Sequence, residues 1–336
     1  MLATYEAYAA VQRISPGVRE EGRSIIKRLI EFVGHDDAAK VTTAALMDWR
    51  DLLLSEQTKR GNLREPRTVR SKYLGTVRAM LSWAVQDKKL PANAASGVVV
   101  RVPKKAKLRE RDFTAEEASA ILTATLKPPA LRLSAGHALA RRWIPWLCAY
   151  TGGRVNEFSQ MRGEDVREIE GIWTVRITPE AGTVKAKEAR VVPIHRHLIE
   201  QGFLDAVLEN GPGPLFYDPA KQRVDSEGNR QFKKVGERLA QWVRKEVGIV
   251  DPAIQPNHAW RHLFKTIGYS VGMEERVADA IQGHTSTLIV RPFQSRTSRV
   301  PGLRLTSSAP SRVPVRSSTR VSRAMSRVVA PGSPPC

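Results

Sequence analysis

Of the 336 residues in the chain, 41% are hydrophobic and 26% are charged, and the formal net charge is +20. This length and hydrophobic content are ordinary for a soluble globular protein with two domains. So large a positive charge indicates the kind of binding partner rather than the fold. Nucleic acid is the leading candidate, because basic side chains that neutralise phosphates release counterions. A membrane surface is a weaker candidate, since the sequence has no long apolar span and no basic amphipathic anchor helix. Two cysteines, Cys148 and Cys336, give no disulfide framework, and the opening residues lack a signal-peptide pattern.

Residues 1–96 are expected to form a small helical domain. Apolar residues recur at helical spacing from Ile25 to Val33 before Gly34, again from Leu46 to Leu53, and in a third helix that starts at Pro66. The other face of this third helix is basic and is either a solvated face or a DNA-binding surface, with Arg67, Arg70, Lys72 and Arg78.

Residues 97–111 are expected to be a basic linker between two domains. The segment is rich in lysine and arginine and contains the single acid Glu110. A plain soluble connector is one interpretation, and a clamp around a duplex is the other. The excess of positive over negative side chains favours the clamp. The candidate DNA contacts in this segment are Arg101, Lys104, Lys105 and Lys107.

Residues 112–284 are expected to form a second, α+β domain, so that the fold class is mainly α with a small antiparallel sheet. Thr114 with Glu116 and Glu117 predicts a helix start, and Gly152 should end a later helix. Alternation predicts one hairpin, with strands at 173–177 and 189–194. Helical spacing predicts three further helices, at 232–247, 258–271 and 274–282.

Residues 285–336 differ in kind from the rest of the chain. They contain nine arginines but no lysine, aspartate or glutamate, and they lack apolar periodicity. Such a segment cannot bury enough surface to offset its ordering entropy, so we expect a disordered tail. It is either a functional basic tail or out-of-frame translation appended to a domain that is incomplete at its C-terminal end. The simultaneous loss of three residue types favours the second interpretation.

Two arginines and their neighbours are suited to holding a phosphodiester. Arg154 begins a helix, where a cation is unfavourable unless an anion sits between it and the backbone N–H groups; pairing with Glu157 is the alternative. Arg261 shares a helix face with His258, and its planar fork can hold a second phosphate oxygen. His258 and His262 also have zinc-binding spacing, but an arginine between them disfavours a cation. Lys185, in the hairpin turn, is either an ordinary exposed lysine or a proton donor to a leaving oxygen.

These segments, in this order, resemble the catalytic domain of the tyrosine recombinase (phage integrase) family. Thr151 to Glu157 matches a Thr-Gly-x-Arg-x-x-Glu motif, Lys185 precedes an Arg-x-Val-Pro stretch at Arg190, and His258 with Arg261 matches His-x-x-Arg. Gly283-His284 matches the Gly-His pair of the family. The helical first domain is similar to the family's core-binding domain, a SAM-like DNA-binding module, and the match covers roughly residues 18–284.

The resemblance implies a set of catalytic roles without any metal or other cofactor. Arg154 and Arg261 would stabilise the charge of the pentavalent phosphate, and Lys185 would protonate the leaving 5′ oxygen. His258 and His284 would position groups and transfer protons. A tyrosine would attack and leave a 3′-phosphotyrosine.

The sequence departs from the family pattern at this nucleophile. The family places its tyrosine about nine residues after the Gly-His histidine, where this chain has Phe293, and no tyrosine follows Tyr269. The resemblance therefore implies a site-specific recombinase or integrase, from a mobile element, that binds double-stranded DNA and is impaired in cleavage. The alternative is a non-catalytic DNA-binding protein that occupies a recombination site and regulates an active relative. Assembly as a homo-oligomer on DNA and association with the nucleoid follow from the same resemblance, and the lack of a disulfide framework favours a cytoplasmic location.

Overall fold

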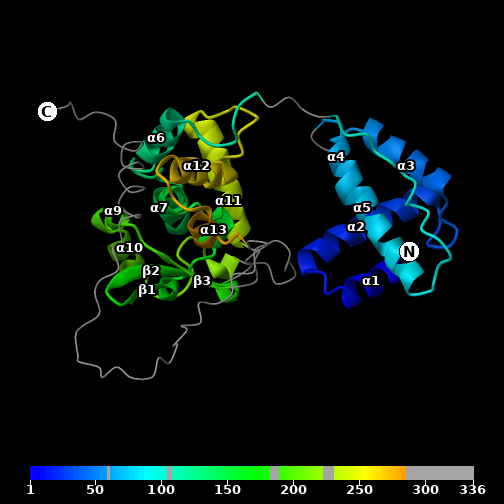
Figure 1. Ribbon diagram of the computed structural model, residues 1–336, viewed down its shortest axis with the longest axis horizontal. Helices are drawn as coiled ribbons and strands as arrows, with labels where there is room; N and C mark the ends of the chain where they lie inside the picture. Colours follow the sequence, from blue (N-terminus) through cyan, green and yellow to red (C-terminus); the bar gives the residue numbers. More distant parts are fainter. Residues whose placement is uncertain (59–60, 104–107, 182–188, 222–230, 285–336) are drawn as a thin grey trace, which may run out of the picture. The chain divides into compact units, whose positions relative to one another are not determined.

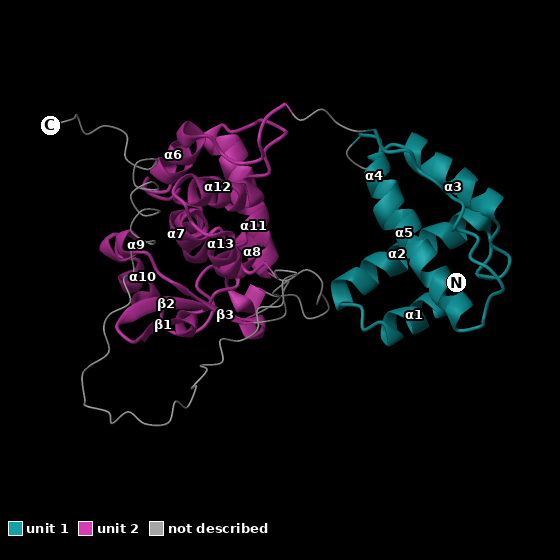
Figure 2. Ribbon diagram, viewed as in Figure 1, with its two compact units in different colours: residues 1–106, 223–229 teal, residues 107–222, 230–336 magenta. Residues whose placement is uncertain are grey.

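The chain forms two compact units, shown in the computed structural model in Figure 1 and coloured separately in Figure 2. The structure describes residues 1–58, 61–103, 108–181, 189–221 and 231–284. Helices α1 to α5 make up the first unit, and every element from α6 onward belongs to the second. Several predictions fall outside the described residues: the disordered tail 285–336 with Phe293, the hairpin lysine Lys185, and the linker residues Lys104, Lys105 and Lys107.

The regular elements in the described part of the first unit are all helical, apart from an isolated β-bridge between Gln57 and Leu63. Its helices are α1 (Leu2–Val11), α2 (Pro16–Val33), α3 (Thr43–Ser55), α4 (Pro66–Thr68), a π-helical turn (Val69–Tyr73) and α5 (Leu74–Gln86). The last three are consecutive, so the third predicted helix runs from Pro66 to Gln86. The predicted end of α2 is also confirmed, because Gly34 has the left-handed φ of 76° that such a cap requires.

The core of the first unit comes from the apolar stripes read in the sequence. Ile26, Leu29, Leu46 and Trp49 are fully buried. Helix α1 was not predicted, because its alanines and tyrosines do not form a distinct apolar stripe, and it packs on α2 through the buried Tyr5.

The second unit combines helices with one small sheet. Its helices are α6 (Ala115–Ala124), α7 (Ala135–Thr151), α8 (Val155–Ser159), α9 (Arg196–Glu200), α10 (Phe203–Asn210), α11 (Gln231–Trp242) with a π-helical turn (Val243–Val247), α12 (Pro256–Ser270) and α13 (Glu275–Gln282). Short 3-10 turns lie at Gly163–Asp165, Pro179–Ala181 and Pro219–Lys221. The start of α6 is confirmed: the Thr114 hydroxyl accepts from the Glu117 backbone N–H, and the Glu117 carboxylate accepts from the Thr114 N–H.

The sheet has one strand more than the predicted hairpin. Strands β1 (Val166–Ile169), β2 (Ile172–Ile177) and β3 (Arg190–Pro193) lie in the order β1-β2-β3, and both pairs are antiparallel. The predicted pairing of β2 with β3 is confirmed, and β1 is a third strand that was not predicted. Strand β1 was not predicted because three of its four residues are exposed, so it shows no alternation of buried and exposed residues. Glu170 and Gly171 join β1 to β2 with φ of 50° and 77°, the positive values of a type I′ turn.

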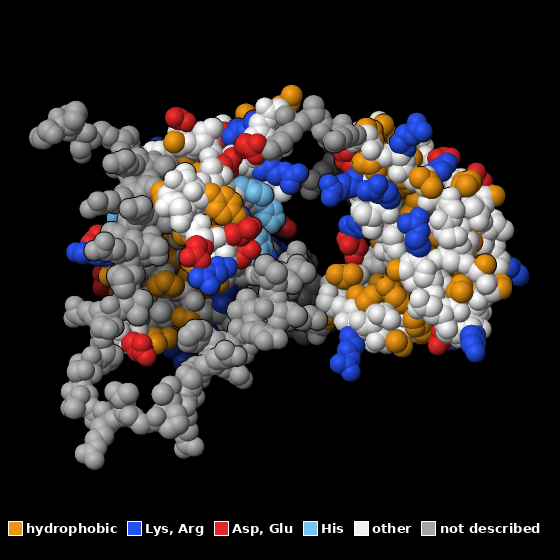
Figure 3. Space-filling view, in the orientation of Figure 1, with side chains coloured by type: hydrophobic (Ala, Val, Ile, Leu, Met, Phe, Trp, Pro, Cys, Tyr) orange, Lys and Arg blue, Asp and Glu red, His pale blue; other side chains and the backbone are white. Residues whose placement is uncertain are grey.

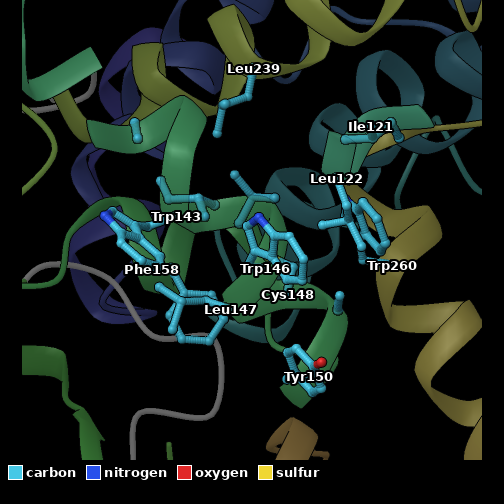
Figure 4. Packing of buried hydrophobic residues seen from close by; sticks show 14 of the residues in the cluster. Ile121, Leu122, Trp143, Trp146, Leu147, Cys148, Tyr150, Phe158, Leu239 and Trp260 are labelled. Carbon is cyan, nitrogen blue, oxygen red and sulfur yellow. The ribbon is translucent and has the colours of Figure 1, made fainter. Parts of the chain in front are cut away.

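Helix α7 runs through the core of the second unit, and its last ten positions are almost all buried. Figure 4 shows Trp143, Trp146 and Leu147 of α7 among side chains from α6, α8, α11 and α12, including Ile121, Leu122, Phe158, Leu239 and Trp260. A helix packed on every side is rigid, so the turn that follows its last residue, Thr151, is held firmly in place. None of the helices in the described ranges is long and apolar enough to cross a membrane.

Candidate phosphodiester site

The turn after α7 lies directly against α12 and α13. Helix α7 ends at Gly152, whose φ of 59° is left-handed. A Cβ atom on Gly152 would lie 2.3 Å from Gln282 Nε2 and 2.8 Å from the Phe264 ring. One on Gly153 would lie 2.6 Å from the Phe158 ring. The two glycines thus allow a backbone approach that no larger residue would permit, and they bring the Arg154 segment beside Arg261.

Arg261 is buried in this contact, with 8% of its surface exposed. Its Nη1 donates to Gly152 O at 2.9 Å and to Gln282 O at 2.8 Å, and its Nε lies 3.3 Å from His284 Nε2. Within the described part of the chain, its buried Nη2 has no hydrogen-bond partner. An unsatisfied buried donor costs about 1–3 kcal/mol, and more when charged. An acceptor that arrived at Nη2 would remove this cost.

The surroundings of Arg261 are short of negative charge. Burial, and then the nearby positive charge of Arg154, lower the pKa of Arg261 to about 10. The charge of Glu157 raises it again and that of Arg190 lowers it. Arg261 still carries its proton at neutral pH, and an anion placed here would restore the charge balance.

Glu157 is the carboxylate between the other two arginines. Its Oε1 accepts from Arg154 Nη1 at 2.8 Å, and its Oε2 accepts from the Arg154 backbone N–H at 3.0 Å. Arg190, the first residue of β3, donates to the same two oxygens at 3.2 and 2.6 Å. The pairing of Arg154 with Glu157, one of two interpretations of the sequence, is therefore present. One carboxylate nevertheless serves two guanidinium groups, which leaves a net positive charge.

The ionised state of Glu157 follows from these partners. Burial alone would raise the pKa of the Glu157 carboxyl, but the hydrogen bond and charge of Arg190, followed by the bonds from Arg154, hold it below its ordinary value. Arg190 also donates to Ile281 O at 3.1 Å, so β3 is tied to the end of α13. The sequence motif contained Arg190 but gave no sign of this double pairing, because it depends on contacts across 33 residues.

The two candidate histidines lie at the ends of the helices that hold Arg261. His258 is exposed in the first turn of α12, one turn before Arg261. His284 follows α13, and its Nδ1 lies 2.9 Å from Asp279 Oδ1. His262 is also exposed and lines a separate pocket with Arg111, Asp112 and Lys265. Within the described ranges, no group of three or more His, Cys, Asp or Glu side chains could hold a metal ion.

The basic candidates of the first unit differ in what their head groups contact. Arg67, Arg70 and Arg101 are exposed, while Lys72 pairs with Glu21. Arg78 is partly buried and donates to Ala95 O at 3.2 Å and Val98 O at 2.8 Å, so its guanidinium holds the segment after α5. On the face seen in Figure 3, lysine and arginine side chains protrude at several places on this unit.

Comparison with known proteins gives a fold but no close relative. No family model and no curated protein matches the chain. A lambda integrase dimer bound to a COC′ core site is 18% identical, with a TM-score of 0.58 over 85% of this chain and 94% of that one. The Tn1549 transposon integrase bound to transposon right end DNA is 17% identical, with a TM-score of 0.57 over 85% and 91%. A lambda integrase tetramer bound to a Holliday junction is 16% identical, with a TM-score of 0.54 over 87% and 79%.

These likenesses establish the fold. The chain has the tyrosine recombinase fold, a helical unit followed by an α+β unit with a three-stranded antiparallel sheet. The resemblance read from the four motifs is confirmed at this level.

Proposed function

We propose that this chain is a site-specific DNA recombinase or integrase by descent, which binds duplex DNA and is impaired in cleavage. The observation that carries the proposal is the buried Arg261 Nη2, which lacks a partner in the described structure and lies beside the Arg154 turn. A phosphate oxygen is the acceptor that suits a forked, permanently charged donor in a positively charged pocket. Two solved structures of the same fold are integrases bound to DNA.

Each of the site residues would have a separate role at one phosphodiester. Arg261 Nη2 would bind one non-bridging oxygen, and the donors of Arg154 that Glu157 does not use would bind the other. Glu157 and Arg190 would hold Arg154 in place. Lys185 would supply the proton for the leaving oxygen, and His258 would lie at the rim.

Cleavage would fail for lack of a nucleophile. Phe293, nine residues after His284, has no hydroxyl, and Tyr269 precedes the Gly-His pair. In a hydrolase whose nucleophile is removed, turnover falls by about 10⁶-fold, and strand exchange depends even more on the covalent intermediate.

The first unit would contribute the remaining contacts with the duplex. Arg67, Arg70 and Arg101 are exposed and form no ion pair among the described residues, so their guanidinium groups would be available to phosphates. The linker lysines Lys104, Lys105 and Lys107, together with Lys72 and Arg78, complete the predicted basic set. Assembly on DNA is part of the proposal, since related structures are a dimer on a core site and a tetramer on a Holliday junction.

The same observations support a second function, that of a non-catalytic protein which occupies a recombination site. The missing tyrosine favours it, while the retained arginine cluster would then bind phosphate without chemistry. Such a protein would block or regulate an active relative.

Selection followed by a trapping assay tests both functions. Duplexes that the full chain enriches from a randomised pool would be nicked near the bound centre and incubated with the protein. We expect binding but no denaturation-resistant adduct. A wild-type adduct would refute impaired cleavage, and failure to enrich any duplex would refute DNA binding.

A second arm separates the two functions. Phe293→Tyr restores the nucleophilic hydroxyl, and it is combined with a C-terminal helix taken from an integrase of this fold because the domain is expected to be incomplete at its C-terminal end. Recovered adduct formation supports a recombinase that lost its nucleophile, whereas tight binding without an adduct supports the non-catalytic function.

A further inference from the structure

The end of α13 returns the chain onto its own last turn. Gly283 has a φ of 64°, its N–H donates to Ala280 O at 3.2 Å, and the His284 N–H donates to Asp279 O at 2.9 Å. This pair of bonds is a Schellman motif, in which a left-handed glycine closes the helix and turns the next residue back along it. The His284 ring therefore lies against Asp279, five residues earlier in the sequence.

Each ring nitrogen of His284 meets a group that fixes its protonation. Nδ1 lies 2.9 Å from Asp279 Oδ1, and an ionised carboxylate can only accept, so Nδ1 must carry the hydrogen. Nε2 lies 3.3 Å from Arg261 Nε, and a guanidinium can only donate, so Nε2 must be bare. Only the neutral imidazole with its proton on Nδ1 satisfies both neighbours.

Lys265 holds Asp279 in the ionised state that this arrangement needs. Its Nζ lies 2.8 Å from Asp279 Oδ1, and this bond is the largest influence that lowers the pKa of the Asp279 carboxyl. Lys265 stands one turn after Arg261 on α12. Helix α12 thus supplies both Arg261, which lies at His284 Nε2, and Lys265, which pairs with Asp279.

We propose that Asp279, held by Lys265, is a positioning residue that fixes His284 with a protonated Nδ1 and a bare Nε2 beside Arg261. This rests on the proposed function, since Arg261 is the phosphate-binding arginine there. A bare Nε2 has one lone pair, so it can accept a hydrogen bond or a proton from a hydroxyl or water at the phosphate when it gives up its bond from Arg261 Nε. A protonated Nε2 would instead donate to a phosphate oxygen, so Asp279 selects between two roles for His284.

The other charges around His284 agree with a neutral ring. Burial lowers the pKa of His284, the Asp279 hydrogen bond raises it, and Arg261 lowers it, with a net result below 6.5. Lys265 of α12 lowers it too, and the guanidinium of Arg190 of β3 lies against Gly283. The ring is therefore uncharged at neutral pH.

Nuclear magnetic resonance of the full chain labelled with ¹⁵N-histidine tests this without DNA, since protonated and bare ring nitrogens differ in chemical shift. The His284 signal is identified by its loss in His284→Gln. We expect a protonated Nδ1, a bare Nε2 and a titration midpoint below 6.5 in the wild type.

Two substitutions at position 279 separate geometry from charge. Asp279→Asn keeps an oxygen acceptor and loses the negative charge, so the Nδ1–H tautomer of His284 persists while the midpoint of the His284 titration falls. Asp279→Ala loses both, so the midpoint falls and the share of the Nδ1–H form decreases. Glu275→Ala is the matched control, because Glu275 also approaches Lys265, at 3.8 Å, but lies outside the bonds made by His284. It should leave tautomer and midpoint unchanged.

A proton on Nε2 in the wild type, or an unchanged tautomer in Asp279→Ala, would overturn the assignment. Circular dichroism spectra of the variants verify that they are folded. Because the measurement needs no DNA, an intact tautomer in a chain that fails to bind duplexes would refute the proposed function and leave the assignment standing.

Discussion

Glu157 illustrates how single residues balance charge in this protein. A carboxylate with 3% of its surface exposed would be costly to bury alone, yet two arginines from separate elements bind it. The sequence suggested only the local partner, Arg154, three residues away. The second, Arg190, comes from β3 and could not be inferred, since its direction depends on the register of the sheet and on the position of α13.

We predict that Glu157→Gln destabilises the protein by about 3–5 kcal/mol, because breaking a buried ion pair by removing one partner leaves the others uncompensated. Urea unfolding of the variant and the wild type measures this. Glu180→Gln is the control, since its carboxylate is 63% exposed and pairs with Arg176 on the surface, where the loss should stay below about 1 kcal/mol. Equal losses in the two variants would contradict the account.

The pH dependence of this difference has a definite sign. The folded state lowers the pKa of Glu157 below its ordinary 4.5, so the unfolded chain binds a proton at a higher pH than the folded one. The stability that Glu157 contributes is therefore present above pH 4.5 and is lost as the pH falls through its folded value. The gap between wild type and Glu157→Gln should narrow in that acidic range.

At the scale of elements, the described helices were largely predictable and their contacts were not. Apolar periodicity located α2, α3, α11 and α12, and cap residues located the start of α6 and the ends of α2 and α7. Strand β1 was missed because its exposed residues carry no pattern, and α1 because it lacks a distinct stripe. The glycine after α7 was recognised as a helix end, but not as a point where side chains of α12 and α13 crowd the backbone.

We predict that Gly152→Ala is much more harmful than a cap mutation elsewhere in the same unit. An added Cβ would suffer the left-handed backbone, at about 1–2 kcal/mol, and would also lie 2.3 Å from Gln282 Nε2. Gly248→Ala is the matched control: its φ is 90°, and nothing in the described structure lies within 4 Å of the added Cβ. Thermal unfolding should show a clearly larger loss of stability for Gly152→Ala than for Gly248→Ala. Equal losses would mean that the turn at Gly152 can accommodate a Cβ atom.

At the scale of the whole molecule, charge indicated the partner and the motifs indicated the fold. The net charge of +20 favoured nucleic acid, and four short motifs in order gave the tyrosine recombinase fold that solved structures confirm. Composition alone could not show which basic residues would bind an anion. The structure adds that Arg261 is buried among positive neighbours with its Nη2 unused in the described chain, which a spacing of residues cannot reveal.

The central claim is that Arg154 and Arg261 bind the same phosphate, and a double-mutant cycle on duplex affinity tests it most directly. Fluorescence anisotropy over a range of salt would compare wild type, Arg154→Gln, Arg261→Gln and the double variant, with Arg196→Gln as control because Arg196 is 88% exposed on α9. We expect each site variant to reduce the salt slope by about 1, and the two losses to be non-additive by about 0.5 kcal/mol or more. Thermal unfolding of each variant verifies that it is folded. Site variants that bind as well as Arg196→Gln, with additive effects and unchanged slopes, would contradict the account.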